Sequence, residues 1–340
     1  MRRTALLLVL CLPGLAVHAG DSNVGRGHFD LARADISAFV DQLAGEGLAR
    51  ERTLALLAAA EPQPKIIDAM NRPAEKTLQW WEYRARFVKD DRIDAGAALW
   101  AEHRELLDQV ALERQVQPEY ILAILGVETL YGRQSGRFRV LDALATLAFD
   151  YPPRAEFFRK ELGAFIRLCD EDGIDPLTAL GSYAGAMGAA QFMPSSYRNF
   201  AVSETGTGHR DLWKNWGDIF ASIANYLHVH GWVMDAPVLS ETRPLNASVP
   251  PVSDRVALDT TVGALAGAGL AVDPALPPGT PAVLVNATQP DGTGWRIGFQ
   301  NFYVITRYNR SPLYAMAVHD LAAAIRTRAL LEPPLAAVGP

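Results

Sequence analysis

A single carboxylate interrupts an apolar helical pattern in residues 118–133, P-E-Y-I-L-A-I-L-G-V-E-T-L-Y-G-R. At the period of an α-helix, one face collects Ile121, Ile124, Leu125 and Glu128. Pro118 suits the first turn of such a helix, and Gly132 supplies a stop just after Glu128. The sequence therefore predicts an acid on a core-facing stripe, at a helix end where a cleft can open.

A partly desolvated carboxyl group in this position is suited to general acid catalysis. Burial disfavours the charged form and raises the pKa, so we expect Glu128 to be able to carry a proton near neutral pH. A rise of about two units corresponds to roughly 2.7 kcal/mol of differential interaction between the two protonation states. The structural alternative is a Glu128 that reaches solvent past the helix end or pairs with Arg133 or Arg137.

A second group of polar residues lies in the glycine-rich stretch 181–197, G-S-Y-A-G-A-M-G-A-A-Q-F-M-P-S-S-Y. Its glycines allow a backbone or a ligand to approach closely. Ser182 and Gln191 place a hydroxyl and an amide beside these glycines, a pairing that can fix the orientation of a polar ligand. The alternative is a tight crossing of two helices.

The loop S-E-T-G-T-G-H-R-D, residues 203–211, has the glycines of a cation loop but few of the ligands. Calcium sites use several carboxylate or carbonyl oxygens at alternating positions. Ser203, Thr205 and Thr207 occupy positions where acids would be expected, which leaves Glu204 and Asp211. The sequence therefore predicts no tightly held metal in this loop.

The elements that must position these groups are mostly helical. Helices are predicted within residues 29–115, from 142 to a break at Pro152, and over 154–169, 219–230 and 313–331. Residues 237–296 are instead rich in Pro, Gly, Thr and Val, which indicates a small β region. Strands are predicted at 252–258, 281–287 and 294–299, and residues 302–310 are expected to be extended or irregular.

The first residues have the pattern of a secretory signal. A basic start, an apolar run and small residues at Val17 and Ala19 predict cleavage after Ala19. Cys11 is a poor lipid attachment point because the bulky Leu10 precedes it and the apolar run surrounds it. No later apolar run approaches the ~20 residues of a membrane span. We therefore expect an exported, soluble mature protein in the periplasm, without a lipid anchor.

The net charge and the cysteine content limit the possible partners and the possible stabilising bonds. The formal net charge is -6, and loss of Arg2 and Arg3 with the signal takes it to -8, with no basic block. This balance argues against nucleic acid as a partner. Cys169 is the only cysteine of the expected mature chain, so an intramolecular disulfide is excluded and stability must come from the core. About 320 residues suffice for one large or two to three small packed units.

Three stretches taken together resemble the lytic murein transglycosylases of the B type, glycoside hydrolase family 103. They are G-V-E-T-L-Y-G-R around Glu128, G-A-M-G-A-A-Q-F-M-P-S-S-Y around Gln191, and R-Y-N-R-S-P-L-Y-A around Asn309. The runs L-D-A-L-A-T-L-A-F-D-Y-P-P-R-A-E-F-F and N-Y-L-H-V-H-G-W are also similar to that family. The resemblance therefore covers nearly all of the expected mature chain.

The resemblance implies an α+β fold, mainly α, with a lysozyme-like core, a helical N-terminal region and a small β insert. The expected boundaries are a signal peptide at 1–19, the helical region at 20–115, the first part of the catalytic core at 116–236, the β insert at 237–296, the C-terminal part of the core at 297–332, and a tail at 333–340.

The resemblance also implies a mechanism with one acid. Most glycosidases use two carboxylates, whereas here Glu128 alone would protonate the glycosidic oxygen between N-acetylmuramic acid and N-acetylglucosamine. The muramyl N-acetyl group would stabilise the positive charge, and Glu128 would then take the proton of the C6 hydroxyl, leaving a 1,6-anhydro end. Implied substrate contacts, each with packing as its alternative role, are Ser182, Gln191, Tyr308, Asn309, Tyr83, Arg154, Met187 and Tyr226.

The expected partners are the glycan strands of peptidoglycan, and other cell-wall enzymes are candidate partners. No cofactor is expected, and calcium is not expected because Ser203 and Thr207 stand where the best-known members carry acids. Two other functions stay open. One is a peptidoglycan-binding scaffold that has lost turnover, and the other is a lysozyme-like hydrolase with Asp142 or Asp150 as its second carboxylate.

Overall fold

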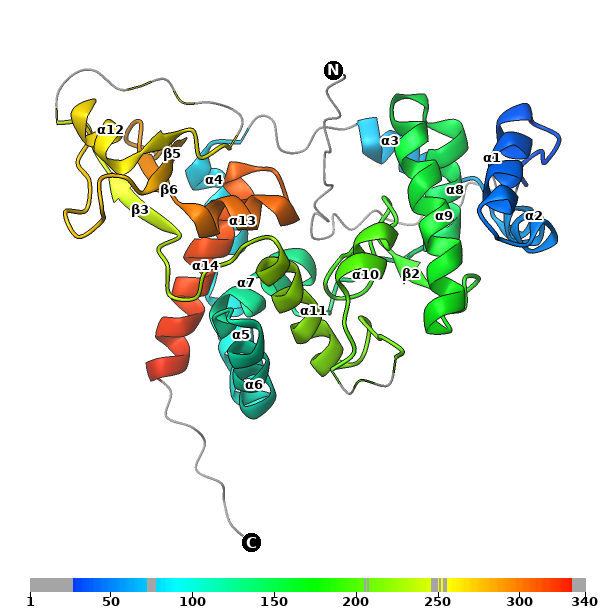
Figure 1. The fold of residues 1–340 in the computed structure, drawn as a ribbon, viewed down its shortest axis with the longest axis horizontal. Helices are drawn as coiled ribbons and strands as arrows, with labels where there is room; N and C mark the ends of the chain where they lie inside the picture. The colour runs from blue at the N-terminus through cyan, green and yellow to red at the C-terminus, as the bar shows by residue number, and fades with distance from the viewer. Residues whose placement is uncertain are drawn as a thin grey trace, which may run out of the picture. The chain divides into compact units, whose positions relative to one another are not determined.

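The chain forms two compact units, each assembled from segments that are far apart in the sequence (Figure 1). The computed structural model describes residues 27–71, 78–204, 206, 208–245, 250, 252 and 256–331. Unit 1 contains the described residues of Glu75–Tyr131 and Ile223–Pro340, and unit 2 those of Val9–Ala74 and Gly132–Ser222. The expected signal peptide and tail lie outside the described residues.

The helices of unit 1 gather around the long helix α14 (Pro312–Leu331), drawn in red in Figure 1. This helix packs against α4, α5, α7 and α13, and its buried residues Tyr314, Val318, Leu321 and Ile325 recur at helical spacing. The helix predicted at 313–331 is therefore confirmed. The other helices are α4 (Trp80–Phe87), α5 (Asp90–Glu102), α6 (Arg104–Arg114), α7 (Pro118–Thr129), α13 (Gln300–Tyr308) and the end of α11 (Trp216–Val229).

Helix α7, which carries Glu128, is buried on every side. All its residues from Glu119 to Thr129 are buried, so the prediction of a single core-facing stripe is wrong. The reason is that α5, α6 and α14 all pack against it, which leaves no face for solvent. Pro118 begins the helix as predicted, but the helix ends before Gly132, because Leu130 already has left-handed backbone angles.

Helix α13 contradicts the extended segment predicted at residues 302–310. The segment is rich in aromatic and β-branched residues, which favour strands by intrinsic propensity. In the folded chain Phe302, Ile305 and Tyr308 follow one another at helical spacing and are all buried, and the helix packs against α14. Tertiary burial thus outweighs the local preference.

A small antiparallel sheet lies in the same unit, with strand order β3-β6-β5-β4. Its strands are β3 (Leu239–Thr242), β4 (Thr260–Thr261), β5 (Pro281–Asn286) and β6 (Trp295–Gly298), and α12 (Val262–Gly267) follows β4. Leu265 of α12 packs with Leu284 and Ile297 of the sheet in one core cluster. The strands predicted at 281–287 and 294–299 are confirmed, whereas the described part of 252–258 forms no strand.

Unit 2 is organised around α8 (Val140–Asp150) and α9 (Ala155–Asp172), which pack against each other. A short 3₁₀ turn, η1 (Pro152–Arg154), separates them at the predicted break. The remaining elements are α1 (Ala34–Gly45), α2 (Arg50–Ala59), α3 (Pro64–Asn71), α10 (Pro194–Phe200), the start of α11, and the two-stranded sheet of β1 (Phe138–Arg139) with β2 (Leu180–Gly181).

Candidate active site

Glu128 is a buried carboxyl group held by a buried phenol. It lies in the last turn of α7 with 4% of its surface exposed, and the Tyr314 hydroxyl of α14 donates a hydrogen bond to its Oε1 at 2.7 Å. Burial, followed by the charge of Glu128, raises the pKa of Tyr314 well above its usual value. The phenol therefore stays protonated and remains a donor to the carboxyl group at physiological pH.

The turn that follows Glu128 has an unusual backbone. Leu130, Tyr131 and Gly132 have φ angles of 50°, 58° and 78° in succession, and the left-handed region costs a residue with a Cβ about 1–2 kcal/mol. Two hydrogen bonds hold Tyr131 in place. Its backbone N–H donates to Leu125 O at 3.1 Å, and its hydroxyl donates to Arg92 O at 2.8 Å. Tyr131 therefore anchors the strained turn that ends the helix of Glu128.

The Tyr131 hydroxyl fits against two helix glycines, which leads to a first prediction. A Cβ added at Gly96 of α5 would lie 2.5 Å from this hydroxyl, and one at Gly126 of α7 would lie 2.7 Å from it. We expect Gly96→Ala to lower the free energy of unfolding by about 1–3 kcal/mol, although alanine is the better helix former. Urea unfolding measures this change.

Two further variants control that experiment. Gly45, at the end of α1, has no atom within 4 Å of an added Cβ, so Gly45→Ala should retain full stability. Adding Tyr131→Phe to the Gly96→Ala chain removes the atom nearest to the new Cβ. This double variant should be more stable to urea than Gly96→Ala alone. Equal stability of Gly96→Ala and Gly45→Ala would contradict the anchoring role of Tyr131.

Tyr308 and Asn309 lie near Glu128 in unit 1. Burial, and next the negative charge of Glu128, raises the pKa of Tyr308 well above its usual value. Asn309 is 3% exposed and its Oδ1 accepts the Ser311 N–H at 3.0 Å. Its Nδ2 is buried and has no hydrogen-bond partner within the described part of the chain. Because buried amide donors are normally satisfied, this Nδ2 is available to a ligand.

The two other expected contacts of unit 1 are tyrosines with defined packing. The Tyr226 hydroxyl donates to Arg307 O at 2.6 Å, and its ring lies 4.8 Å from that of Tyr308 in a T-shaped arrangement. Tyr83 of α4 is 1% exposed, with its ring centroid 5.0 Å from that of Phe87. The structure thus brings Glu128 together with Tyr308 and Tyr226 in one tyrosine-rich cluster.

In unit 2 the glycine-rich stretch forms a loop, so the helix-crossing alternative is wrong. Bridges of Met187 to Gly181 and to Phe192 fold it back on itself. The Ser182 Oγ accepts the Ala186 N–H at 3.0 Å inside this loop. Ser182 and Met187 are 2% and 0% exposed, so both shape the loop from within.

Gln191 and Arg154 complete the predicted set. Gln191 is 5% exposed and has a φ of 52°, and its Nε2 donates to Ser135 O at 3.1 Å and Gly188 O at 2.9 Å. A left-handed non-glycine residue in an enclosed loop is a form of strain that occurs often at functional sites. The Arg154 guanidinium carbon lies 4.3 Å from the centre of the Phe157 ring.

The carboxylates considered for a two-acid hydrolase have structural partners. Asp142 accepts two hydrogen bonds from Arg139, at 2.6 and 2.8 Å, and one from the Glu61 N–H at 2.8 Å. Asp150 accepts from Arg33 at 2.6 Å. Both belong to unit 2, where the bonds to Glu61 and Arg33 connect α8 to the segments after α2 and before α1. These contacts favour packing roles for both aspartates.

Asp218 of α11 connects the two ends of the 203–211 loop through contacts to the backbone. Its side chain accepts the N–H groups of Glu204 and Asp211, each at 2.8 Å. The described residues contain no cluster of three or more His, Cys, Asp or Glu side chains that could hold a metal ion. Thr205 and Thr207 lie outside the described residues, so the expected absence of calcium stays a prediction.

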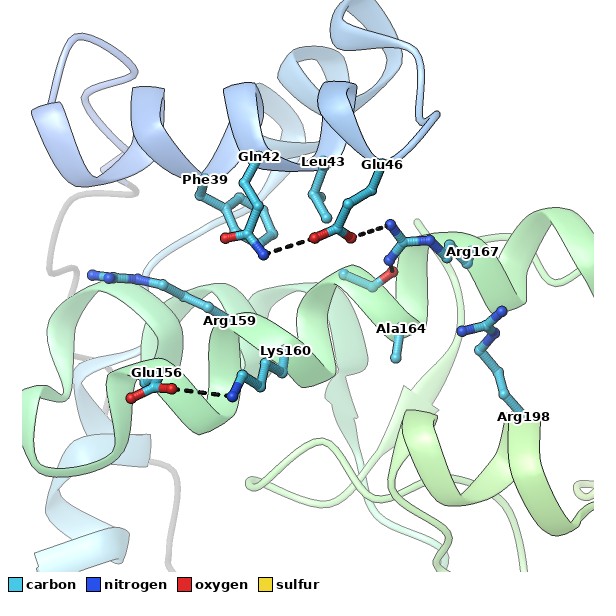
Figure 2. Close-up of a pocket in the computed structure, with 11 residues that line it drawn as sticks. Phe39, Gln42, Leu43, Glu46, Glu156, Arg159, Lys160, Ala164, Arg167 and Arg198 are labelled. Atoms are coloured by element: carbon cyan, nitrogen blue, oxygen red, sulfur yellow. Dashed lines mark hydrogen bonds and ion pairs between the residues drawn. The ribbon is translucent and has the colours of Figure 1, made fainter. Parts of the chain in front are cut away.

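A groove of about 530 Å³ lies between α1 and α9 in unit 2 (Figure 2). Phe39 and Leu43 supply apolar surface, and charged side chains surround them. Two ion pairs lie within the groove, Arg167 with Glu46 at 2.5 Å and Lys160 with Glu156 at 3.0 Å. None of the predicted site residues lines it, so the groove is separate from the predicted substrate contacts.

Sequence reasoning missed Tyr314 as the partner of Glu128. The residue falls within the motif R-Y-N-R-S-P-L-Y-A, but a tyrosine in the first turn of an apolar helix looks like an ordinary core residue. The contact with Glu128 is seen only in the folded chain, where Tyr314 lies close to α7. Its place five residues after Asn309 is the single signal that could have drawn attention to it.

A buried acid beside tyrosine side chains, in a mainly helical fold, suits an enzyme that cleaves glycosidic bonds by general acid catalysis. The family described as Transglycosylase SLT domain matches residues 32–323. The chain therefore belongs to this transglycosylase family, which confirms the resemblance found in the sequence.

Similar proteins agree with this assignment. The membrane-bound lytic murein transglycosylase B of Escherichia coli (strain K12) is 37% identical over 297 residues, 84% of this chain and 81% of that protein. The structure of catenated lytic transglycosylase SltB1 from Pseudomonas aeruginosa has 42% identity and a TM-score of 0.82, covering 87% of this chain and 98% of the other. SltB3 from the same organism, in complex with NAG-anhNAM-pentapeptide, has 30% identity and a TM-score of 0.74, covering 85% and 78%. The expected mainly helical, lysozyme-like fold class is confirmed.

Proposed function

We propose that this lytic transglycosylase cleaves the β-1,4 bond between N-acetylmuramic acid and N-acetylglucosamine in peptidoglycan, with Glu128 as its acid and base. The supporting observation is the 2.7 Å hydrogen bond between the buried Tyr314 hydroxyl and the buried Glu128 carboxyl group. This bond holds the buried carboxyl group in a defined orientation, which general acid catalysis requires.

The proposed reaction uses the Glu128 carboxyl group twice, first as an acid and then as a base, and consumes no water. Glu128 gives its proton to the glycosidic oxygen as the bond from C1 of the muramyl residue to that oxygen breaks, and the muramyl N-acetyl group stabilises the positive charge at C1. The Glu128 carboxylate then takes the proton of the C6 hydroxyl as O6 bonds to C1. The Tyr314 hydroxyl stabilises the carboxylate between the two steps. The product ends in a 1,6-anhydro ring, and Glu128 is protonated again.

We also propose which residues contact the substrate. The buried Nδ2 of Asn309 is a donor for a sugar or N-acetyl oxygen, and Tyr308 and Tyr226 provide aromatic surface beside it. Gln191, Arg154 and Tyr83 are proposed to contact the glycan, and Ser182 and Met187 to shape the loop that holds Gln191. The pentapeptide-bearing muropeptide in the SltB3 complex supports a peptidoglycan strand as the ligand.

The enzyme is proposed to act in the periplasm, without a lipid anchor, a cofactor or calcium. The sequence pattern of an export signal in residues 1–19 supports the location. Among the described residues, no helix is both long enough and apolar enough to cross a membrane. Other cell-wall enzymes stay candidate partners.

Mass spectrometry of the soluble products tests the proposed reaction. After incubation with purified peptidoglycan, we expect muropeptides that are lighter than the reducing-end forms by the mass of one water. Reducing-end products would instead indicate a hydrolase with a second carboxylate. Binding to peptidoglycan without any released product would indicate a scaffold that has lost turnover.

A further inference from the structure

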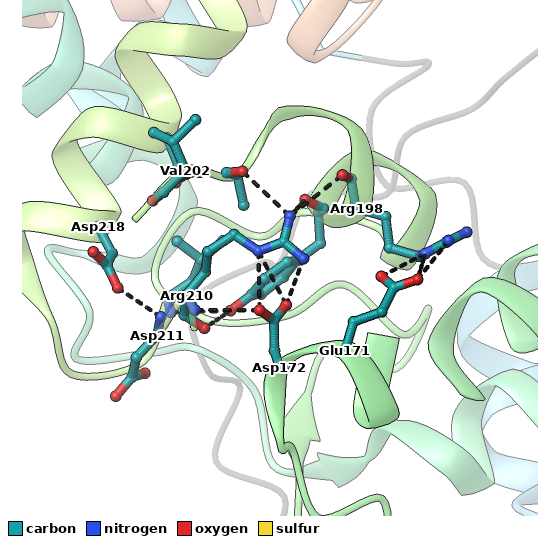
Figure 3. Close-up of polar contacts among 11 residues, drawn as sticks. Glu171, Asp172, Arg198, Val202, Arg210, Asp211 and Asp218 are labelled. Carbon is teal, nitrogen blue, oxygen red and sulfur yellow. Dashed lines mark hydrogen bonds and ion pairs between the residues drawn. The ribbon is translucent and has the colours of Figure 1, made fainter. Parts of the chain in front are cut away.

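Arg210 joins the ends of two helices in unit 2 (Figure 3). Its Nε and Nη2 donate to the Asp172 carboxylate at the end of α9, with distances of 2.7 to 3.1 Å. Its Nη1 donates to the carbonyl oxygens of Arg198 and Ala201, each at 3.3 Å, and of Tyr197 at 3.5 Å, at the end of α10. One guanidinium thus uses three nitrogens to hold five oxygens.

These contacts offset two unfavourable features of the helix ends. The last carbonyl groups of a helix have no partner within the helix, and a carboxylate at a helix C-terminus is repelled by the helix dipole. The Asp172 side chain is also fully buried, with 0% exposure, so its charge needs a buried counterion. Arg210, whose side chain is 16% exposed, supplies that counterion and satisfies the carbonyl groups.

A chain of hydrogen bonds leads from Arg210 to the turn that carries Gln191. The Tyr197 hydroxyl donates to Arg210 O at 2.5 Å and accepts the Leu212 N–H at 3.3 Å. Leu212 O in turn accepts the Ala189 N–H at 2.7 Å. The next link is Gly188, whose carbonyl oxygen accepts both the backbone N–H and the side-chain Nε2 of Gln191.

Close packing makes this connection stiff. Gly188 has a φ of 65°, and a Cβ added there would lie 2.4 Å from Leu212 O. The backbone at Leu212 therefore touches the glycine turn directly, so a shift of the Arg210–Leu212 segment must move the turn or break the contact. Gln191 follows three residues later and has little independent freedom, because both its nitrogens bond to Gly188 O.

The acids Asp211 and Asp218 of the 203–211 loop region already have hydrogen-bond partners within the chain. Calcium takes six to eight oxygen ligands. Both oxygens of Asp218 already accept backbone N–H groups, and Asp211 Oδ1 accepts those of Trp213 and Lys214 at 2.8 and 3.1 Å. Here Arg210 supplies the positive charge that contacts the buried Asp172 carboxylate and the backbone carbonyl groups at the end of α10.

We propose that Arg210 is a positioning residue, a cation built into the chain that joins the ends of α9 and α10 in place of an exchangeable metal ion. Through Tyr197 and Leu212 it sets the position of the turn that carries Gln191. The inference rests on the proposed function in one respect, because it takes Gln191 to contact the glycan.

Two variants of the full chain, Arg210→Ala and Arg210→Lys, test this inference. Lysine keeps the charge but lacks the planar fork that bonds to Asp172 and the carbonyl groups together, so both variants should lower Tm, lysine less than alanine. At temperatures where both are folded by circular dichroism, we expect turnover of peptidoglycan to fall by about a hundredfold with Arg210→Ala, as misplaced contact groups do. Arg198→Ala is the matched control, because the Arg198 side chain pairs with Glu171 at the partly exposed surface.

The same substitutions in a Gln191→Ala chain separate positioning from general stability. If Arg210 acts through Gln191, Arg210→Ala or Arg210→Lys should cause little further loss of turnover in that chain. An equal loss in both backgrounds, or no effect of Gln191→Ala alone, would overturn the inference. Arg210→Lys keeps this comparison available if Arg210→Ala does not fold.

The Tm of the unchanged chain with calcium chloride and with EDTA provides a readout that is independent of activity. We expect the same Tm in both conditions. A rise of Tm with calcium would overturn the inference that Arg210 takes the place of a metal ion. Failure of the proposed function has a different signature, since the unchanged chain would then release no anhydro products while its Tm still reports on calcium.

Discussion

Glu128→Gln is expected to lower the rate of peptidoglycan cleavage by about 10³-fold, within the range contributed by a positioned acid or base. Glutamine has nearly the same shape and can still accept the hydrogen bond of Tyr314, but its amide cannot give up a proton to the glycosidic oxygen. The fold and the affinity for glycan should therefore be retained. Product release measured by mass spectrometry, together with a peptidoglycan sedimentation assay, checks both parts.

Glu119→Gln provides the matched control in the same helix. Glu119 is also buried, at 6% exposure, but its carboxyl group faces Arg326 at 3.5 Å. Burial raises the pKa of Glu119, so a perturbed pKa alone does not mark the catalytic acid. We expect Glu119→Gln to retain turnover. Undiminished cleavage by Glu128→Gln, or an equal loss in the two variants, would rule out the one-acid mechanism.

Tyr314→Phe is expected to move the alkaline limb of the pH–rate profile to higher pH. A hydrogen bond donated to a carboxylate favours its charged form. Without the Tyr314 donor, Glu128 keeps its proton to higher pH, so activity that needs the protonated acid is lost later as pH rises. If the Tyr314 hydrogen bond stabilises the charged form of Glu128 by about 1.4 kcal/mol more than the neutral form, its loss moves the alkaline limb by about one pH unit. The maximal rate should also fall, because the carboxyl group loses the contact that orients it.

Tyr120→Phe is the control for this profile. Tyr120 is a buried tyrosine of the same helix as Glu128, and its hydroxyl bonds to His319 Nδ1 at 2.9 Å rather than to Glu128. This variant loses a buried phenol hydrogen bond of similar length and should leave the alkaline limb in place. A profile for Tyr314→Phe that coincides with that of the unchanged chain would show that the phenol does not tune Glu128.

The local pattern of the chain was enough to identify most helices and the acid at the end of α7. Pro118 begins that helix, Pro152 breaks α8 from α9, and apolar spacing identifies α14, because proline and helical periodicity act through neighbouring residues. Three short motifs in the right order also identified the family, which the match over residues 32–323 confirms. These features depend on residue type and spacing alone.

Contacts between distant segments could not be predicted in this way. The partner of Glu128 is Tyr314, 186 residues further along the chain, and Asp172 meets Arg210 across 38 residues. The burial of α7 on every side, and the helical state of residues 300–308, likewise depend on what packs against them. The pairing of Glu128 with Tyr314 and the helical state of residues 300–308 have no local sequence signal, because both are set by neighbours in space.

The sequence by itself determined which chemistry is present: one acid at a helix end, a glycine-rich loop with Ser182 and Gln191, and a Tyr308–Asn309 pair. Only the tertiary structure decided how each group is held. It joined the described residues of Glu75–Tyr131 and Ile223–Pro340 into one unit, which brings the Tyr314 phenol to Glu128, and it assigned Asp142 and Asp150 to ion pairs. The physical reason is that side-chain type sets what a group can do, whereas its partners and its exclusion from water arise only when the core closes around it.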